Sequence, residues 1–92
     1  MLLLKMETTE LIGMMDNVFD VVFVDAGHTY DECYSDLMLS LRSTKVDGKI
    51  LVHDYADPNH ASVKKATDDF CNAHRLMIKE VFHSIAVIHV KN

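Results

Sequence analysis

The sequence predicts an α/β protein in which a parallel β-α-β unit is followed by an antiparallel hairpin, with the helices packed on the sheet. The first observation is a continuous β-branched and aromatic run over residues 18–24, which is typical of a parallel strand buried on both faces. The second is an apolar pattern of helical period that begins a few residues later. The third is another short apolar run over residues 49–53, far enough along the chain for a crossover between parallel strands.

The composition fits one small globular domain over residues 1–92, since 49% apolar and 25% charged residues can bury a limited core. The net charge of −5 would repel phosphate backbones, so we expect no nucleic acid partner. No apolar run approaches the ~20 residues that span a bilayer, so we expect no membrane contact. Cys33 and Cys71 are too few for a disulfide framework, and no signal-peptide pattern precedes them, which favours the cytoplasm.

The N-terminal segment, residues 1–17, has the weakest pattern of the chain. Thr8 or Thr9 would cap a short helix that ends near Met15. Residues 1–4 are an apolar run that would add a further strand. We therefore expect a short helix in this segment and treat the strand as a second expectation.

The first strand, Val18–Val24, leads into a helix start. Thr29 and Glu32 have the spacing of a capping box, in which both side chains satisfy backbone donors of the first helical turn. Apolar side chains then recur at helical period and form one stripe: Tyr30, Cys33, Tyr34, Leu37, Met38 and Leu41. This helix is expected to pack on the sheet.

The remainder of the β-α-β-α-β-β order over residues 18–92 follows from shorter signals. A turn at Asp47-Gly48 precedes a second strand, Lys49–His53, and a loop runs through Pro58-Asn59. The last elements are a helix and the two strands of an antiparallel hairpin: Ser62–Ala73, Leu76–Phe82 and Ile85–Val90. Only two residues separate the last two runs, which predicts a tight hairpin that closes the sheet.

Polar residues follow both parallel strands at the point where each strand ends. Because the carboxyl ends of parallel strands share one edge of the sheet, we expect these residues to converge within roughly 5–10 Å. They are Asp25, Gly27 and His28 after the first strand, and His53, Asp54 and Tyr55 after the second. Two carboxylates and two imidazoles can hold a divalent ion or set a general base beside an electrostatic partner. Alternatively, Asp25 and Asp54 only cap loops and helix starts.

The other histidines are scattered over a loop, a helix end and the hairpin. We expect surface or half-buried side chains without a functional role for all of them: His60, His74, His83 and His89. The His53-Asp54 doublet also occurs in metal phosphohydrolases, but those proteins are all-helical, whereas this doublet follows a strand.

Linked motifs in this chain resemble a known family. They are Phe19-Asp20-Val21-Val22-Phe23-Val24-Asp25-Ala26-Gly27-His28-Thr29-Tyr30, Asp36-Leu37, Asp47-Gly48-Lys49-Ile50 and His53-Asp54-Tyr55. Over Asp16–Asn92 the sequence is similar to the C-terminal half of class I S-adenosylmethionine-dependent methyltransferases, particularly small-molecule O-methyltransferases. The resemblance implies a Rossmann-like half-domain with the fourth and fifth strands of that family, their helices and its terminal antiparallel pair.

The same resemblance implies roles for the residues at the strand ends. Asp25 and Asp54, together with His53, would hold a magnesium ion against the acceptor oxygen. His28 would be the catalytic base. Asp25, Ala26 and Gly27 would contact S-adenosylmethionine.

One feature of the family is missing from these residues. The family binds its cofactor mainly through a Gly-rich turn after its first strand and an acidic residue after its second, whereas Gly13, Gly27 and Gly48 are isolated. We interpret the chain as a truncated methyltransferase half-domain, either part of a longer protein or a free-standing half. A strand at the edge of such a half-sheet recruits partners. We therefore expect a homo-oligomer that uses the edge of residues 18–24 or the N-terminal segment.

Three functional hypotheses follow. The first is a binding or assembly module that is non-catalytic or depends on a partner and takes, at most, a small-molecule ligand. The alternative is an S-adenosylmethionine-dependent O-methyltransferase acting on a small molecule, with its cofactor site completed by another chain or by an N-terminal half. The third is a metal-dependent hydrolase built on Asp25, His28, His53 and Asp54, which requires a bound metal.

Overall fold

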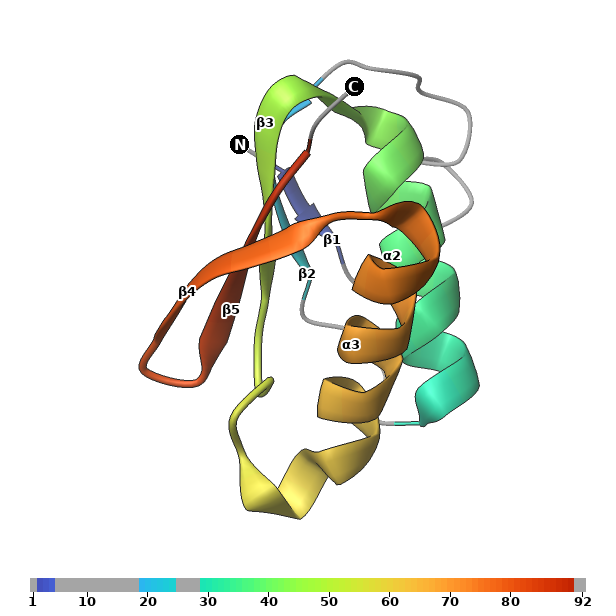
Figure 1. The fold of residues 1–92 in the computed structure, drawn as a ribbon, viewed down its shortest axis with the longest axis vertical. Helices are drawn as coiled ribbons and strands as arrows, with labels where there is room; N and C mark the ends of the chain where they lie inside the picture. Colours follow the sequence, from blue (N-terminus) through green and yellow to red (C-terminus); the bar gives the residue numbers. More distant parts are fainter. Residues whose placement is uncertain (1, 5–18, 25–28, 91–92) are drawn as a thin grey trace.

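The structure, a computed structural model, describes residues 2–4, 19–24 and 29–90 and contains one five-stranded sheet. Its strands are β1 (Leu2–Leu4), β2 (Phe19–Val24), β3 (Thr44–Val52), β4 (Met77–Phe82) and β5 (Ile85–His89). They lie in the order β1-β2-β3-β5-β4. The first three are parallel, and β5 is antiparallel to both β3 and β4 (Figure 1). The predicted α/β class is confirmed, as are the parallel β-α-β unit and the terminal hairpin.

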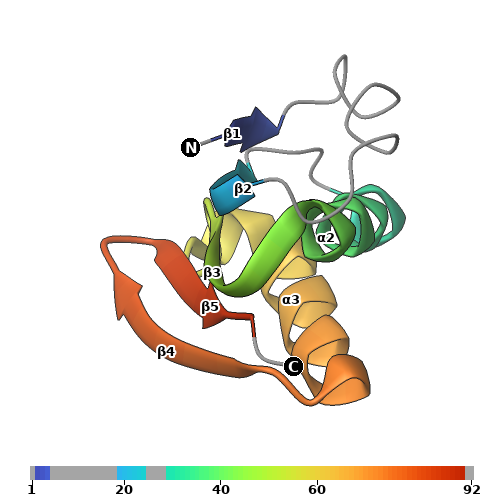
Figure 2. The same cartoon turned by 90° about the horizontal axis from the view of Figure 1, so that it is seen from above.

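Two α-helices, α2 (Tyr30–Ser43) and α3 (Ala61–His74), cover the same face of the sheet, as Figure 2 shows. A short 3-10 helix, η2 (Pro58–His60), directly precedes α3. Side chains from both helices and from β2, β3 and β5 share one core: Val22, Val24, Cys33, Leu37, Ile50, Val52, Tyr55, Val63, Ala66, Phe70, Cys71, Ala86, Ile88 and Val90. No helix among the described residues is long and apolar enough to cross a membrane.

Helix α2 begins where the capping box predicts. The Thr29 hydroxyl oxygen accepts a hydrogen bond from the Glu32 N–H at 3.2 Å and donates to Glu32 Oε1 at 2.7 Å. The N–H of Cys33 closes the first turn on the Thr29 carbonyl. The start of the helix is therefore fixed by local contacts, and it orients the stripe that contains Cys33 and Leu37 toward the sheet.

Strand β1 confirms that the apolar start of the chain adds a strand, since Leu2–Leu4 pairs in parallel with Val22–Val24. Strand β2 is therefore internal to the sheet along these residues. The short helix predicted from Thr8 or Thr9 to Met15 lies outside the described residues.

Strand β3 begins at Thr44, five residues before the predicted start at Lys49. Phe19 pairs with Thr44 and Val21 with Lys49, so the intervening residues form a bulge. Asp47, in this bulge, has a left-handed backbone with φ 69°. The turn predicted at Asp47-Gly48 is therefore an interruption within a longer strand. Pairing with β2 extends β3 on the N-terminal side of this interruption, as far as Thr44.

Candidate functional site

The carboxyl ends of β2 and β3 meet at one edge of the sheet. Val24 pairs with Val52, and the His53 N–H donates a hydrogen bond to the Val24 carbonyl at 3.0 Å. The aromatic ring of Phe23 lies 5.9 Å from the His53 ring, centroid to centroid. The parallel arrangement on which the predicted site depends is therefore present, and it places His53 and Asp54 at the end of β2.

The residues expected after β2 lie outside the described part of the chain. They are Asp25, Ala26, Gly27 and His28. They connect Val24 to Thr29, and both of these flanking residues are described. The roles expected for the four residues stay predictions.

His53 and Asp54 contact each other directly. His53 Nδ1 lies 3.1 Å from Asp54 Oδ2, and the His53 side chain is 42% exposed whereas that of Asp54 is 18% exposed. Asp54 has a left-handed backbone with φ 65°. Aspartate tolerates this conformation better than most residues, and here it turns the chain sharply out of β3.

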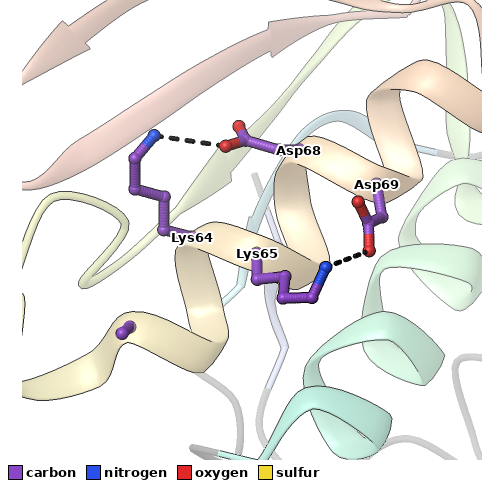
Figure 3. Close-up of a pocket in the computed structure, with 5 residues that line it drawn as sticks. Lys64, Lys65, Asp68 and Asp69 are labelled. Carbon is purple, nitrogen blue, oxygen red and sulfur yellow. Dashed lines mark hydrogen bonds and ion pairs between the residues drawn. The ribbon is translucent and has the colours of Figure 1, made fainter.

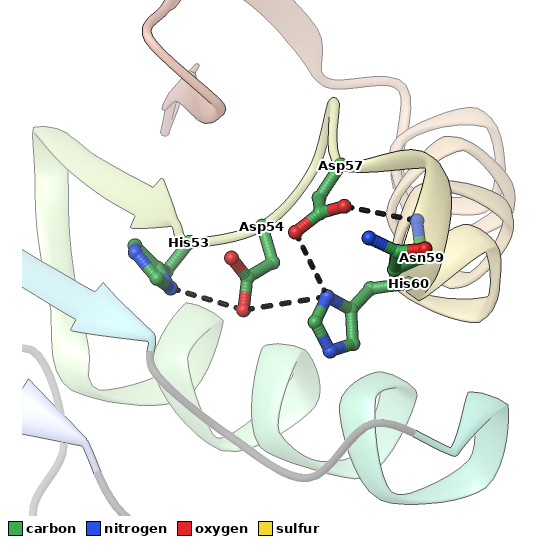
Figure 4. Close-up of polar contacts among 5 residues, drawn as sticks. All are labelled: His53, Asp54, Asp57, Asn59 and His60. Atoms are coloured by element: carbon green, nitrogen blue, oxygen red, sulfur yellow. Dashed lines mark hydrogen bonds and ion pairs between the residues drawn. The ribbon is translucent and has the colours of Figure 1, made fainter.

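Two further side chains, Asp57 and His60, lie beside Asp54. His60 Nδ1 is 3.2 Å from Asp57 Oδ2 and 3.9 Å from Asp54 Oδ2. Figure 4 shows His53, Asp54, Asp57 and His60 facing one another along the segment from β3 to η2. One ligand atom from each of Asp54, Asp57 and His60 lies within 4.8 Å of the other two. We call His53, Asp54, Asp57 and His60 the β3-end cluster.

Asp57 is held in the cluster by its role as a helix cap. Its Oδ1 accepts a hydrogen bond from the Asn59 N–H at 2.9 Å, at the start of η2, and Pro58 occupies the first helical position. Hydrogen bonding to Asn59, with a smaller contribution from His60, lowers the pKa of Asp57. The residue is therefore an ionised acceptor at neutral pH.

The metal ligands expected from the sequence coincide only in part with this geometry. Asp54 belongs to the group whose atoms could hold an ion, but its neighbours there are Asp57 and His60 rather than His53. Asp57 was not among the site residues predicted from the sequence, and no functional role was expected for His60. Their signal is local: a capping Asp followed by Pro and Asn starts a tight turn, and that turn returns the next residue toward Asp54.

Tyr55, expected at the polar edge, points toward α3 instead. Its hydroxyl donates to Asp68 Oδ1 at 2.6 Å and accepts from Lys64 Nζ at 3.1 Å, and the residue is buried. Burial, followed by the hydrogen bond to Asp68, raises the pKa of Tyr55. Tyr55 therefore attaches the segment after β3 to α3.

Two adjacent hollows lie on the helix layer. One, of about 320 Å³, is lined by Ala61, Lys64, Lys65, Asp68 and Asp69, and Figure 3 shows the Lys64–Asp68 and Lys65–Asp69 ion pairs that border it. The other, of about 490 Å³, is lined by Tyr30, Asp31, Tyr34, Ser35, Asp69 and Ala73. Neither is lined by a residue of the β3-end cluster. The cluster is a polar edge and not part of these hollows.

The remaining histidines lie away from the cluster. At the end of α3, His74 Nε2 is 3.1 Å from Sδ of Met38 in the middle of α2, and His89 Nε2 is 3.5 Å from Asp47 Oδ1. The His83 ring stacks edge-on against Phe82 in the hairpin turn. Of the four histidines expected to have no role, only His60 lies in the cluster.

The chain matches the model of a known protein family. A family model described as a methyltransferase domain matches residues 3–55, which is more than half of the chain. The matched segment includes most of β1, all of β2, α2 and β3, and the first half of the β3-end cluster. Comparison with curated proteins finds no match.

Proposed function

This chain belongs to the methyltransferase domain family, and from that premise we propose that it is a partner-dependent methyltransferase module that binds cofactor and acceptor at the carboxyl edge of β2 and β3. The single observation that carries this proposal is the meeting of the two parallel strand ends at His53. Ligands of open α/β sheets bind at such edges. The family match ends at Tyr55, immediately after this edge.

S-adenosylmethionine is the cofactor in this proposal, and its main binding surface comes from a second polypeptide segment. When bound, the cofactor supplies a methyl group on a positively charged sulfur. Asp54 and Asp57 suit such a ligand, because carboxylates near a cation attract it. Asp25, Ala26 and Gly27 continue from β2 and are the proposed cofactor contacts within this chain.

The acceptor is a small molecule with a hydroxyl group. His28 is the proposed base, since a neutral imidazole takes up a hydroxyl proton near neutral pH. Asp54 orients the acceptor from the end of β3, and its contact with His53 Nδ1 holds its carboxylate in place.

A divalent ion is compatible with the same edge. Two carboxylates and one imidazole, from Asp54, Asp57 and His60, are a donor set that Mn²⁺ or Mg²⁺ accepts. Bound there, such an ion would polarise the acceptor oxygen. The residues that would hold it in this proposal are Asp54, Asp57 and His60, with Asp25 as a further carboxylate.

The cofactor part of the proposal is tested by nuclear magnetic resonance on the full chain labelled with ¹⁵N. S-adenosylhomocysteine and S-adenosylmethionine are titrated separately to millimolar concentration. We expect shifts of the amide signals of Val24, His53 and Asp54, and none for residues 79–82 in the hairpin. Asp54→Asn should weaken binding, whereas Asp20→Asn, at the opposite end of β2, should leave it unchanged.

The outcomes separate the two forms of the first hypothesis. Shifts at the strand ends support a module that binds cofactor and needs a partner for full affinity. A folded spectrum with no shift at this edge, for either compound, would overturn the proposal and assign the chain to a non-catalytic role.

The metal part is tested with Mn²⁺, whose unpaired electrons broaden nearby signals. We expect broadening centred on Asp54–His60, reversal by excess Mg²⁺, and loss in Asp57→Asn. Broadening centred instead on the half-buried carboxylates of α3, Asp68 and Asp69, would exclude the β3-end cluster as the preferred site.

A further inference from the structure

The outer edge of β4 is an unpaired strand edge with an apolar surface. Strand β4 is terminal in the sheet, and within the described residues it pairs only with β5. Three of its side chains are large, apolar and exposed: Met77 at 66%, Val81 at 49% and Phe82 at 62%. In Figure 1 the hairpin extends away from the helices, so the helix layer does not cover this edge.

A bulge gives this strand an unusual distribution of side chains. In a regular strand Met77 and Phe82, five residues apart, would point to opposite faces. The pairing with β5 is irregular between Ile78 and Glu80, and it places Met77 opposite His89 and Phe82 opposite Ile85. His89 and Ile85 lie on the same, half-buried face of β5. Met77 and Phe82 therefore share one face.

The two residues inside this pair share the other face. Ile78 lies opposite Ile88, and Val81 lies opposite Ala86. Ile88 and Ala86 are both fully buried on the side that the helices cover. The sequence of β4 is therefore symmetric about the midpoint between Lys79 and Glu80. Met77 and Phe82 lie at equal distances from this midpoint on one face of the sheet, and Ile78 and Val81 do so on the other face.

From this symmetry we propose that the outer edge of β4 is a homodimer interface. An antiparallel two-fold pairing about the midpoint would place Met77 opposite Phe82 of the partner subunit and Ile78 opposite Val81 of the partner subunit. Lys79 would lie opposite Glu80 of the partner subunit, so each chain supplies one positive and one negative charge. Opposite charges directly across a strand pair stabilise it, and like charges destabilise it.

Charge complementarity indicates that the partner at this edge is a second copy of the chain. A lysine in a bulge commonly protects an edge strand from unspecific pairing. Here the adjacent Glu80 supplies the opposite charge. An antiparallel second copy in this register forms two Lys79–Glu80 pairs across the interface, one from each chain. Because a six-residue edge buries much less than a standard interface, we expect a dissociation constant on the order of 10–100 µM.

The experiment is sedimentation equilibrium of the full chain over a range of concentrations, with three charge variants. K79E and E80K should each raise the dimer dissociation constant about tenfold, because each puts two like-charged pairs across the interface. The double variant K79E/E80K restores opposite charges and should return the constant to the wild-type range. K45E, on β3, is the matched control and should change nothing.

The two single variants change the net charge in opposite directions. K79E lowers it from −5 to −7, and E80K raises it from −5 to −3. A general charge effect would therefore weaken association in one and strengthen it in the other. Hydrogen exchange of residues 77–82 should also slow as concentration rises. A strict monomer at 1 mM, or a dimer that the single variants leave unchanged, would overturn the proposal; circular dichroism confirms that each variant is folded.

Discussion

At the scale of single residues, Asp36 is the side chain whose environment is least favourable. It is 5% exposed on α2, and no described residue hydrogen-bonds to its Oδ2. Burial, with a smaller contribution from Glu32, raises its pKa from 3.8 to about 6. The charged form of Asp36 is therefore more costly in the folded protein than in the unfolded chain.

We predict that Asp36→Asn stabilises the protein at neutral pH by about 1–2 kcal/mol. A raised pKa means that the folded state binds the proton more tightly. The wild-type stability conferred by this group is therefore complete below about pH 4 and is lost as the pH rises through about 6. The variant has no such titration, so its advantage should appear at pH 7.5 and vanish at pH 4.

Urea denaturation at the two pH values measures this difference. Asp31→Asn is the control, because Asp31 is exposed in the first turn of the same helix. Loss of its charge should slightly destabilise the helix by removing a favourable dipole interaction. An Asp36→Asn variant that is less stable than wild type at pH 7.5 would show that the carboxylate has a compensating partner.

The candidate site was only partly predictable from individual residues. His53 and Asp54 could be found because they directly follow an apolar strand, and strand ends in parallel sheets converge. Asp57 and His60 could not be found in this way, because their proximity to Asp54 depends on how η2 turns after Pro58. The run Asp57-Pro58-Asn59 indicates a tight turn, but residue types alone do not show that this turn brings His60 close to Asp54.

At the scale of elements, the bulge of β3 requires a residue without a side chain. A Cβ on Gly48 would lie 2.6 Å from Thr44 Cγ2, 2.7 Å from the Asp20 carbonyl oxygen and 2.8 Å from the Lys45 carbonyl oxygen. Two of these atoms belong to the backbone, so relief requires movement of a strand. The bulge is also tied to the end of β5, since Val90 exchanges backbone hydrogen bonds with Asp47 and Gly48.

We therefore predict that Gly48→Ala destabilises the protein by about 1–3 kcal/mol, as overpacking does in other cores. Asp47→Gly, one residue earlier, should stay within about 1 kcal/mol of wild type, because glycine adopts the positive φ of Asp47 without strain. Urea denaturation midpoints compare the two. If Gly48→Ala is as stable as Asp47→Gly, the three atoms close to Gly48 do not exclude a side chain at this position.

Two tyrosines attach neighbouring segments to α3 by the same arrangement. Tyr55 donates to Asp68 and lies under Lys64, with its ring centroid 4.6 Å from the ammonium nitrogen. Tyr30 donates to Asp69 at 2.7 Å and lies near Lys65. In both, the lysine and the aspartate are one helical turn apart on α3. The arrangement connects the segment after β3, and the start of α2, to one helix.

We predict that Tyr55→Phe costs about 1–2 kcal/mol of stability, because a buried hydroxyl loses its bond to a charged acceptor. Tyr30→Phe should cost less, since Tyr30 is more exposed and water replaces the lost bond. Thermal unfolding of the two variants gives the order. Equal losses would contradict burial as the cause.

The elements themselves were largely predictable. Capping by Thr29 and the two-residue connection of the hairpin are local, and both were confirmed. The helical stripe of α2 is also local, and it packs on the core except at Met38, which is 43% exposed. The start of β3 was not predictable, because residues 44–48 have no strand pattern of their own. They are strand because Thr44 pairs with Phe19, which is a contact across the sheet.

At the scale of the whole molecule, both helices and three strands contribute to one hydrophobic core. Cys33 on α2 and Cys71 on α3 belong to it, at 1% and 5% exposure. Burial raises the pKa of each thiol to about 11, so neither is a reactive thiolate at neutral pH. The burial of Cys33 agrees with its expected place in the apolar stripe of its helix.

A single shared core predicts a single unfolding transition. Cys33 lies between the helices with Thr67 as a hydrogen-bond partner, so α2 cannot leave the core without exposing α3 as well. Thiol labelling in urea should therefore begin at the same denaturant concentration in Cys33→Ala and Cys71→Ala, each of which retains one thiol. It should also coincide with the loss of helical circular dichroism. Labelling of Cys33 at a lower urea concentration than Cys71 would instead mean that α2 detaches by itself. Because α2 directly follows the polar edge after β2, that edge would then belong to the less stable part of the fold.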